Sequence, residues 1–399
     1  MARRLKILQI FNRYMQYGGE EGSVYRIGDA MQSIHDVEYF LTSTESWIAR
    51  RGGNRIAMLA DTFANLEIVR RLRRYQKIGR FNVWQIHNVI PTMSPLVYRE
   101  AFRANIPVVH YLHNYRLFCA NGFFLNHGEP CMRCAGGNFL PAVQTACWRN
   151  SRLNSGLMSA VILEMRAFGL FEKTAAWISI SQRQKDIHAS WGIPREKIEV
   201  IPHFYEAGES PLPPGSSESI LFLGRLSSEK GVAQLIEAWS LLKTRGKQRL
   251  IIAGDGPERA ALERLAQKLD AKNVEFRGFI DRNEQTALWR ESRASVVPSI
   301  WEEPFGMVVL EAWSKGRAVI ANRIGALPEI IDHGVNGLLA QPFSPEALAS
   351  QMDEMLRNPD RASQMGLEGY NKLKSRYNRE EWVLKLRNLY HKVGNELPL

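Results

Sequence analysis

Two short segments of the C-terminal half combine charged side chains and glycines in a pattern that suits anion binding. The first, residues 224–231, reads Gly-Arg-Leu-Ser-Ser-Glu-Lys-Gly and lies between an apolar run and a helix-like run. A diphosphate needs close backbone approach, positive charge and a helix N-terminus, and this segment offers glycine at both ends together with Arg225 and Lys230. An ordinary strand-to-helix turn with surface Arg and Lys is the alternative interpretation.

The second segment, residues 303–311, places two carboxylates at the two ends of Glu-Pro-Phe-Gly-Met-Val-Val-Leu-Glu. We expect a helix over residues 304–314 with Pro304 in its first turn. The free N–H groups of that turn would point at a common anion, and they belong to Phe305, Gly306, Met307 and Val308. Glu303 beside the anion could accept hydrogen bonds from sugar hydroxyls, and Glu311 within an apolar run suggests a ligand. The alternative makes Glu303 a helix cap and Glu311 a solvated residue.

The elements around these segments follow an alternation of apolar runs and helix-like stretches in both halves of the chain. In the N-terminal half, the run 5–11 leads to Gly18 and Gly19, and the run 107–112 leads to His113. In the C-terminal half, strands near 219–223, 249–253, 274, 295 and 318 alternate with helices near 231–242, 258–269 and 304–314. Such alternation predicts an α/β fold with two doubly wound, Rossmann-like domains whose sites lie at the strand carboxyl ends.

A length of 399 residues fits two domains of ordinary size. The composition changes near residues 202–219 to Pro, Gly, Ser and Glu, as in a linker. We therefore predict an N-terminal domain at 1–205, a linker at 206–218 and a C-terminal domain at 219–375. The last segment, 376–399, carries a loosely helical apolar pattern and is expected to pack back on the N-terminal domain.

These motifs resemble those of the family 4 glycosyltransferases, a group of retaining enzymes whose two Rossmann-like domains face each other across a cleft in the GT-B fold. The matching residues are Gly18-Gly19-Glu20, His113, 224–226, 229–231, 254–257 and 303–311. The resemblance implies transfer of a sugar from a UDP- or GDP-linked donor with retention at the anomeric carbon. The leaving diphosphate itself would help to deprotonate the incoming hydroxyl, so neither an enzyme nucleophile nor a catalytic metal is required. The lack of an Asp-X-Asp motif agrees with this.

The resemblance also assigns roles to residues of the C-terminal domain. Arg225 and Lys230 would bind the donor diphosphate, Glu311 the ribose hydroxyls and Glu303 the transferred sugar. The amides of 305–308 would meet the sugar and phosphates, and the developing negative charge of the leaving group would be neutralised by the two cations and the helix N-terminus.

On the N-terminal side, Gly18 and Gly19 would allow close approach to the diphosphate, and His113 would face the sugar. Backbone groups near Gly278 and Phe279 would recognise the nucleotide base. The predicted catalytic set is His113, Glu303, Arg225 and Lys230.

All four cysteines fall in one segment, with the spacing C-x11-C-x2-C-x12-C at Cys119, Cys131, Cys134 and Cys147. The central C-x2-C is typical of half a tetrahedral zinc site, and the outer two residues could complete a four-thiolate shell. We predict a structural Zn²⁺ in an insertion over about residues 114–150 that shapes the acceptor pocket. An iron–sulfur cluster, two disulfides and four thiols without a metal are the alternatives, and a cytosolic setting disfavours the disulfides.

The positive charge of the chain belongs to its N-terminal half. Residues 1–205 carry 26 Lys and Arg against 15 Asp and Glu, which accounts for the whole net charge of +11. Such an excess indicates an anionic partner. We expect residues 61–79 to form one helix with an apolar stripe (Phe63, Leu66, Val69, Leu72 and Tyr75) and basic residues near its end. That pattern suits an anionic bilayer surface, and a solvated charged helix face is the alternative.

The start of the chain does not read as a signal peptide, and no run reaches the roughly 20 apolar residues of a membrane span. We therefore expect a cytoplasmic enzyme, peripheral at the inner face of the cell membrane. Its acceptor would be a glycan or a polyprenyl-diphosphate-linked glycan, and its role the biosynthesis of a surface polysaccharide such as lipopolysaccharide.

Two other function classes explain parts of the sequence. A sugar-nucleotide-processing enzyme of the epimerase type would share the two-domain shape, and it would form epimerised nucleotide sugar without an acceptor. A zinc-containing nucleic-acid-binding protein would explain the pI of about 9.5. The cysteine segment, however, holds few basic residues, so we expect no nucleic-acid partner.

Overall fold

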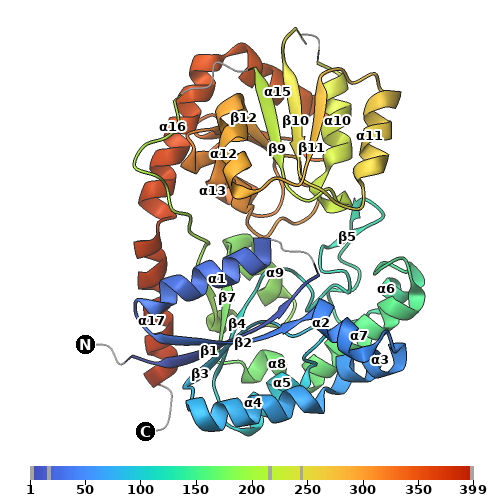
Figure 1. Ribbon diagram of the computed structural model, residues 1–399, viewed down its shortest axis with the longest axis vertical. Helices are drawn as coiled ribbons and strands as arrows, with labels where there is room; N and C mark the ends of the chain where they lie inside the picture. Colours follow the sequence, from blue (N-terminus) through green and yellow to red (C-terminus); the bar gives the residue numbers. More distant parts are fainter. Residues whose placement is uncertain (1–3, 16–18, 214–217, 243–245, 396–399) are drawn as a thin grey trace. The chain divides into compact units, whose positions relative to one another are not determined.

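The computed structural model describes residues 4–15, 19–213, 218–242 and 246–395, and the chain divides into two compact units (Figure 1). Unit 1 comprises residues 1–123, 132–202 and 382–399, and unit 2 comprises 124–131 and 203–381. The segment 124–131, which lies inside the predicted insertion, is thus part of unit 2. The chain from Trp382 onward is part of unit 1.

The sheet of unit 1 is parallel throughout, with strand order β2-β1-β3-β4-β7-β8. Its strands are β1 (Lys6–Arg13), β2 (Asp36–Ser43), β3 (Val83–Asn88), β4 (Val108–Tyr111), β7 (Ala176–Ser179) and β8 (Ile198–Val200). The interior of β1 is buried on both faces, as expected of a sheet with helices on both sides. Two of its buried residues, Gln9 and Asn12, are polar and therefore need hydrogen-bond partners inside the unit.

Helices and one short 3₁₀ turn connect these strands (Figure 1). They are α1 (Gly19–Gln32), α2 (Thr44–Arg51), α3 (Arg55–Ala64), α4 (Leu66–Gly79), α5 (Leu96–Arg103), α6 (Leu140–Gln144), α7 (Arg152–Ala167), α8 (Leu170–Lys173), α9 (Gln182–Ser190) and η1 (Arg195–Lys197). The last helix of the chain, α17 (Arg379–Asn395), contributes Tyr390 to unit 1, where its hydroxyl donates to Gln85 Oε1.

The expected single helix over residues 61–79 is wrong, because the chain breaks at Asn65 into α3 and α4. The side chain of Asn65 caps α4 by accepting a hydrogen bond from Ile68 N at 3.1 Å, and its backbone is not helical. The predicted apolar stripe is also divided: Val69 and Leu72 are buried in the unit, whereas Leu66 is 56% exposed. Burial inside unit 1 thus uses part of the helix face that the sequence suggested for a membrane.

The sheet of unit 2 is parallel as well, with strand order β11-β10-β9-β12-β13-β14, an arrangement typical of a Rossmann-like domain. Its strands are β9 (Ser219–Leu223), β10 (Arg249–Ala253), β11 (Val274–Gly278), β12 (Ser292–Val297), β13 (Ala318–Asn322) and β14 (Gly337–Ala340). The order changes direction at β9 and β12, so loops that follow these two neighbouring strands flank the point where such domains bind ligands.

The helices of unit 2 pack on this sheet around a core that includes Leu235, Trp239, Ile252 and Ile320. They are η2 (Ser228–Lys230), α10 (Val232–Ser240), α11 (Arg259–Lys268), α12 (Arg282–Glu291), α13 (Met307–Ser314), α14 (Leu327–Ile330), α15 (Pro345–Arg357) and α16 (Pro359–Arg376). A small antiparallel hairpin, β5 (Leu125–Asn126) with β6 (Glu129–Pro130), completes the unit. Within the described part of the chain, every helix is too short or too polar to cross a bilayer.

Candidate active site

The segment 224–231 forms the loop that leaves β9 and enters α10 through the single turn η2. Gly231 has a φ of 69°, and a Cβ atom at this position would lie 2.0 Å from Pro298 O, so the loop needs glycine to pass β12 this closely. Arg225 is exposed, and no hydrogen bond or ion pair of its side chain is recorded with the described residues. The loop therefore offers one guanidinium that is available to a ligand at the carboxyl end of β9.

Lys230, at the end of the same loop, pairs with Glu303. Its Nζ donates to Glu303 Oε2 at 2.9 Å and lies 5.2 Å from the ring centroid of Trp301. The same carboxylate oxygen accepts hydrogen bonds from Ser299 Oγ at 2.8 Å and from Trp301 Nε1 at 2.9 Å. Three donors thus converge on Oε2 of a side chain that is only 8% exposed.

The other oxygen of Glu303, Oε1, has no recorded donor among the described residues, and it is not among the fully buried atoms that lack a partner. It can therefore accept a hydrogen bond from a ligand while Oε2 is held in place. Gly325 keeps this arrangement close, because a Cβ there would lie 2.4 Å from Glu303 N and O. Glu303 is thus a fixed carboxylate with one oxygen left for a hydroxyl.

The helix that follows begins later than expected: α13 starts at Met307, with Gly306 as its N-cap, rather than at Pro304. The reason is that Gly306 has a φ of 94°, which lies outside the helical region. The hydrogen bonds recorded for the described residues include none from the backbone N–H groups of Phe305, Gly306, Met307 and Val308. The predicted set of free amides is therefore present, although two of the four precede the helix.

The first turns of α13 also show which face of the helix a ligand can reach. Val309, Leu310 and Ala312 are buried, whereas Met307, Val308 and Glu311 are half-buried. Residues spaced by three and four share one face of a helix, so Glu311 lies on the same side as the free amides. Glu311 is therefore on the accessible side, within reach of a ligand that spans more than one helical turn.

Gly278 and Phe279 lie at the carboxyl end of β11, on the same edge of the sheet. Gly278 has a φ of 74° and its carbonyl accepts a hydrogen bond from Gly254 N at 2.7 Å, while Phe279 is 75% exposed. A parallel sheet brings all these strand ends to one edge. That edge of unit 2 holds Arg225, the Lys230–Glu303 pair, the free amides and Glu311, an arrangement that can bind a phosphorylated polyhydroxy compound.

In unit 1, His113 follows β4 and contacts a row of buried polar side chains. Its Nε2 lies 2.9 Å from His87 Nδ1, and His87 Nε2 in turn lies 2.8 Å from Gln9 Oε1 and 3.0 Å from Gln85 Nε2. Burial lowers the pKa of His113 to about 3, so its ring is neutral at pH 7. The ring also stacks on Tyr111 with centroids 4.9 Å apart.

This row of hydrogen-bonded side chains couples the tautomers of His87 and His113. When His87 Nε2–H donates to Gln9 Oε1, His87 Nδ1 accepts a hydrogen bond from His113 Nε2–H, and Nδ1 of neutral His113 carries no proton. When Gln85 donates to His87 Nε2 instead, the polarity reverses and His113 presents an N–H donor. The glutamines of β1 and β3 therefore set the tautomers of the His87–His113 pair.

The remaining sequence predictions for unit 1 concern glycines and cysteines. Gly19 is the first residue of α1, whereas Gly18 lies outside the described residues. Within the described ranges, no group of three or more His, Cys, Asp or Glu side chains could hold a metal ion, and Cys119 Sγ donates to Asn121 Oδ1 at 3.0 Å. The four-thiolate zinc site has no support in this arrangement and stays a prediction, which metal analysis of protein purified without added metal would test.

Several residues of the site were missed at the level of the sequence. Ser299 and Trp301 hold Glu303, and His87 contacts His113, but none of them belongs to a recognisable motif. Only the position of His87 at the end of an apolar run, like that of His113, could have indicated it. The partners of a side chain depend on which strands are neighbours, and local sequence does not carry that information.

Two known protein families match this chain, each over one part of it, and together the matches cover most of its length. Residues 206–372 match the family described as Glycosyl transferases group 1, and residues 17–207 match the family described as Glycosyltransferase Family 4.

Similar proteins of known sequence include an uncharacterised glycosyltransferase of Methanocaldococcus jannaschii, 39% identical over 34% of this chain and 35% of that protein. They also include the alpha-D-kanosaminyltransferase of Streptomyces kanamyceticus, 28% identical over 44% of this chain and 46% of that protein. The matched region thus spans less than half the length of each of these two relatives.

Solved structures match the whole architecture. The sucrose-phosphate synthase of Thermosynechococcus elongatus superposes with a TM-score of 0.69 at 18% identity over 99% of this chain and 100% of that chain. The Anabaena protein HepE in complex with UDP-glucose gives a TM-score of 0.70 at 19% identity over 98% of this chain and 100% of that chain. At this level of identity the likeness establishes the fold.

Proposed function

We infer that this chain transfers a sugar from a nucleoside-diphosphate sugar to an acceptor hydroxyl. The reason is that it belongs to the family 4 glycosyltransferases and has the GT-B fold. The observation that carries the proposal is the group of residues at one edge of unit 2. There a carboxylate held by Lys230, Ser299 and Trp301 lies next in the chain to four unused backbone amides.

The donor would place its diphosphate at the positive end of this site. Arg225 is available for charge-assisted hydrogen bonds, and the amides of 305–308 add neutral donors at a helix N-terminus. Glu311 would accept hydrogen bonds from the ribose. Since HepE is solved with UDP-glucose, UDP-linked sugars are the first donors to test, and GDP-linked sugars the second.

The chemistry we propose retains the configuration of the anomeric carbon. The bond from that carbon to the diphosphate oxygen breaks, and a bond to the acceptor oxygen forms on the same face, while the acceptor proton passes to a phosphate oxygen. Catalysis then depends on stabilising the negative charge that develops on the leaving diphosphate. Arg225, Lys230 and the free amides would supply that stabilisation, and no catalytic metal takes part in the proposed step.

Glu303 and His113 would orient the sugar. Oε1 of Glu303 can accept from a sugar hydroxyl because Oε2 is occupied by its three donors. The lowered pKa of His113 keeps its ring uncharged, so that it exchanges hydrogen bonds with a sugar hydroxyl and adds no positive charge beside the anomeric carbon.

The test is transfer from a panel of UDP- and GDP-sugars by the purified protein, with release of nucleoside diphosphate as the readout. Glu303→Gln and Lys230→Ala should each lower turnover by about 10²-fold, the usual loss when a transition-state contact is removed. Lys268→Ala is the control, because Lys268 is exposed at the C-terminal end of α11. Equal loss in the control, or epimerised nucleotide sugar formed without acceptor, would refute the proposal.

We also propose that the acceptor is a glycan or polyprenyl-diphosphate-linked glycan of a surface polysaccharide, reached at the inner face of the cell membrane. The supporting observations are two exposed apolar side chains, Ile56 of α3 at 81% and Ile78 of α4 at 74%, and the exposed basic residues Arg70 and Lys77 of α4, which we take together as the proposed membrane surface.

Co-sedimentation with vesicles tests the membrane part of this proposal. Vesicles rich in anionic phospholipid should retain the protein at low salt, and vesicles of phosphatidylcholine alone should not. The double variant Ile56→Ser, Ile78→Ser should weaken retention, and binding that ignores both lipid charge and this variant would contradict the proposed surface.

A further inference from the structure

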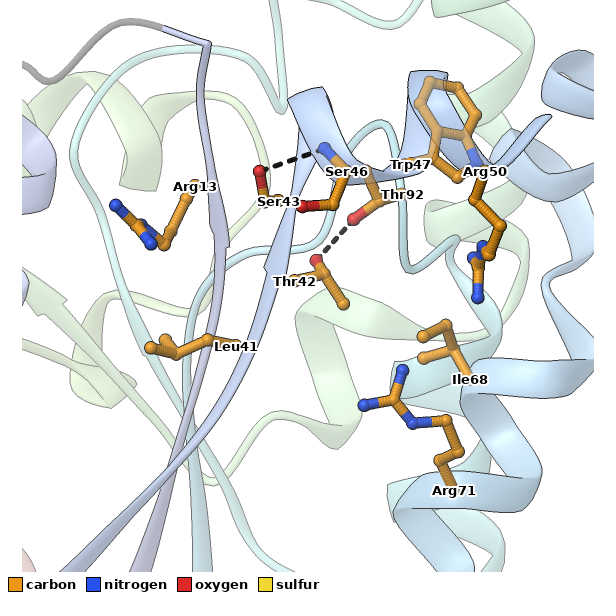
Figure 2. A pocket seen from close by; sticks show the side chains of 10 residues that line it. All are labelled: Arg13, Leu41, Thr42, Ser43, Ser46, Trp47, Arg50, Ile68, Arg71 and Thr92. Atoms are coloured by element: carbon orange, nitrogen blue, oxygen red, sulfur yellow. Dashed lines mark hydrogen bonds between the residues drawn. The ribbon is translucent and has the colours of Figure 1, made fainter. Parts of the chain in front are cut away.

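A cavity of about 300 Å³ lies within unit 1, at the edge of the sheet where β1 and β2 end (Figure 2). Arg13 is the last residue of β1, and Thr42 and Ser43 are the last residues of β2. The far wall comes from α2 and α4, which contribute Arg50 and Arg71. Carboxyl ends of parallel strands are the usual ligand-binding edge of an α/β domain, so the position alone makes the cavity a candidate site.

Three guanidinium groups line this cavity, and their charges are not all balanced. Arg13 pairs with Glu21 at 2.6 Å, and Arg50 pairs with Glu67 at 2.5 Å. For Arg71 no carboxylate lies within ion-pair distance among the described residues, and its guanidinium carbon lies 5.2 Å from the ring centroid of Phe40. In Figure 2, Arg50 reaches from α2 and Arg71 from α4 toward the space beside Ile68. Since Arg50 is balanced by Glu67, Arg71 brings the uncompensated positive charge to this space, and that charge favours an anion there.

Hydroxyl groups form the opposite wall, and a buried amide keeps part of them in place. Thr42 and Thr92 are hydrogen-bonded to each other, and their hydroxyl oxygens lie 3.2 Å and 2.7 Å from Asn12 Oδ1. The hydroxyl that does not donate to the other threonine donates to this oxygen. Asn12 is itself fixed, because its Nδ2 donates to Ile90 O at 3.0 Å. Ser46, at the start of α2, adds an exposed hydroxyl for which no partner is recorded among the described residues. The cavity thus joins guanidinium groups with a fixed polar wall.

This combination matches a phosphate group better than a carboxylate. A carboxylate is planar and is satisfied by one guanidinium in a two-point contact, whereas a phosphate presents oxygens in several directions. Here cations approach from two helices, and hydroxyls come from β2, from α2 and from the loop after β3. A volume of about 300 Å³ admits a phosphate or diphosphate with part of an attached sugar. The net charge of +11 on residues 1–205 favours the same kind of ligand.

We propose that this cavity binds a phosphate or diphosphate group of the acceptor, with Arg71 as its main contact. The assignment rests on the proposed glycosyl transfer and names the chemical class of the acceptor. A lipid-linked diphosphate and a water-soluble sugar phosphate share this chemistry. Arg71 would act in binding, since it lies in unit 1 and is not part of the donor site in unit 2.

The first experiment is calorimetric titration of inorganic pyrophosphate into the full-length protein, with the donor site filled by a saturating nucleoside diphosphate. Arg71→Ala should weaken binding by about tenfold or more, as expected for the loss of one charge-assisted contact. Arg74→Ala is the matched control, because Arg74 is exposed on the same helix and does not line the cavity. Arg71→Gln, with circular dichroism, guards against a folding defect in the alanine variant.

Failure of the wild type to bind pyrophosphate, or equal weakening in the Arg71 and Arg74 variants, would overturn the proposal. Competition then identifies the source of the phosphate group: the competitors are a short-chain polyprenyl diphosphate in micelles and a sugar 1-phosphate. If neither compound displaces pyrophosphate, the assignment to an acceptor is overturned. Donor hydrolysis without acceptor reports on the proposed function separately. It should stay unchanged in Arg71→Ala, and a drop there equal to the drop in pyrophosphate affinity would contradict a separate site.

Discussion

Acidification should destabilise unit 1 through histidines that are buried in the neutral form. Burial lowers the pKa of His110 to about 3 and that of His35 and His188 to about 4, and all three side chains are at most 7% exposed. In the unfolded chain a histidine titrates near 6.5. Between the folded and unfolded pKa values the unfolded state binds more protons, so stability contributed by these residues is present above pH 6.5 and is lost as pH falls.

The magnitude follows from the unfolded pKa alone, as long as the folded pKa stays well below 5.5. Between pH 7.5 and pH 5.5 each buried histidine costs about 1.4 kcal/mol, or about 4 kcal/mol for three. Glu20 acts in the opposite direction, because burial raises its pKa to about 7, and it offsets at most about 2 kcal/mol. Its side chain is only half-buried, so solvent reduces that offset. The net loss from these four residues is therefore about 2–4 kcal/mol.

Hydrogen exchange followed by mass spectrometry can measure this loss separately in each unit. Peptides from β4 and β7 should lose protection at pH 5.5 relative to pH 7.5, after correction for the intrinsic pH dependence of exchange. In His110→Gln the pH-dependent loss should be smaller than in the wild type by about 1.4 kcal/mol. His391→Gln is the control, because His391 is exposed on α17 in the same unit. An unchanged loss in His110→Gln, or equal relief in both variants, would refute the reasoning.

Three further outcomes follow from contacts in the two units. Gly231→Ala should lower the free energy of unfolding by about 1–3 kcal/mol more than Gly334→Ala does, as measured by thermal unfolding. Both glycines have a positive φ, but only at Gly231 would the new Cβ atom meet a backbone oxygen, so equal effects would contradict the clash. Arg166→Ala should open segment 117–139 to limited proteolysis, since its guanidinium lies 5.0–5.5 Å from three phenylalanine rings and donates to Leu117 O; an unchanged cleavage pattern would argue against this. His87→Phe should lower turnover by about tenfold with little change in donor KM, because stacking remains while the contact to His113 is lost; a change in KM alone would point to a different role.

Much of the architecture could be predicted from the sequence, because it depends on local patterns. Apolar runs such as 219–223 and 249–253 are strands in the structure at the predicted positions, and the helices between them begin within a few residues of the expected sites. Both sheets proved parallel, and the fold is GT-B as the motifs implied. The segments 224–231 and 303–311, singled out by their residue types, both lie at the carboxyl-terminal edge of the sheet of unit 2, where we propose that the donor binds.

Boundaries that depend on a single backbone conformation were not predictable in the same way. Pro304 suggested a helix start, but Gly306 adopts a left-handed conformation and α13 begins at Met307. The periodicity of residues 61–79 suggested one helix, but Asn65 caps a new one. In both places a local conformation with non-helical dihedral angles overrides a periodic pattern.

The sequence by itself thus determined the strand and helix order, the glycine-containing turns and the carboxylates that could bind a donor, because each of these depends on neighbours along the chain. Only the tertiary structure decided which groups meet. Lys230 joins Glu303 across 73 positions, Tyr390 reaches Gln85 across 305, and Arg50 and Arg71 line one cavity from two helices. The order of strands in the two sheets sets these contacts, and strand order arises from burial of the whole sheet rather than from any short segment.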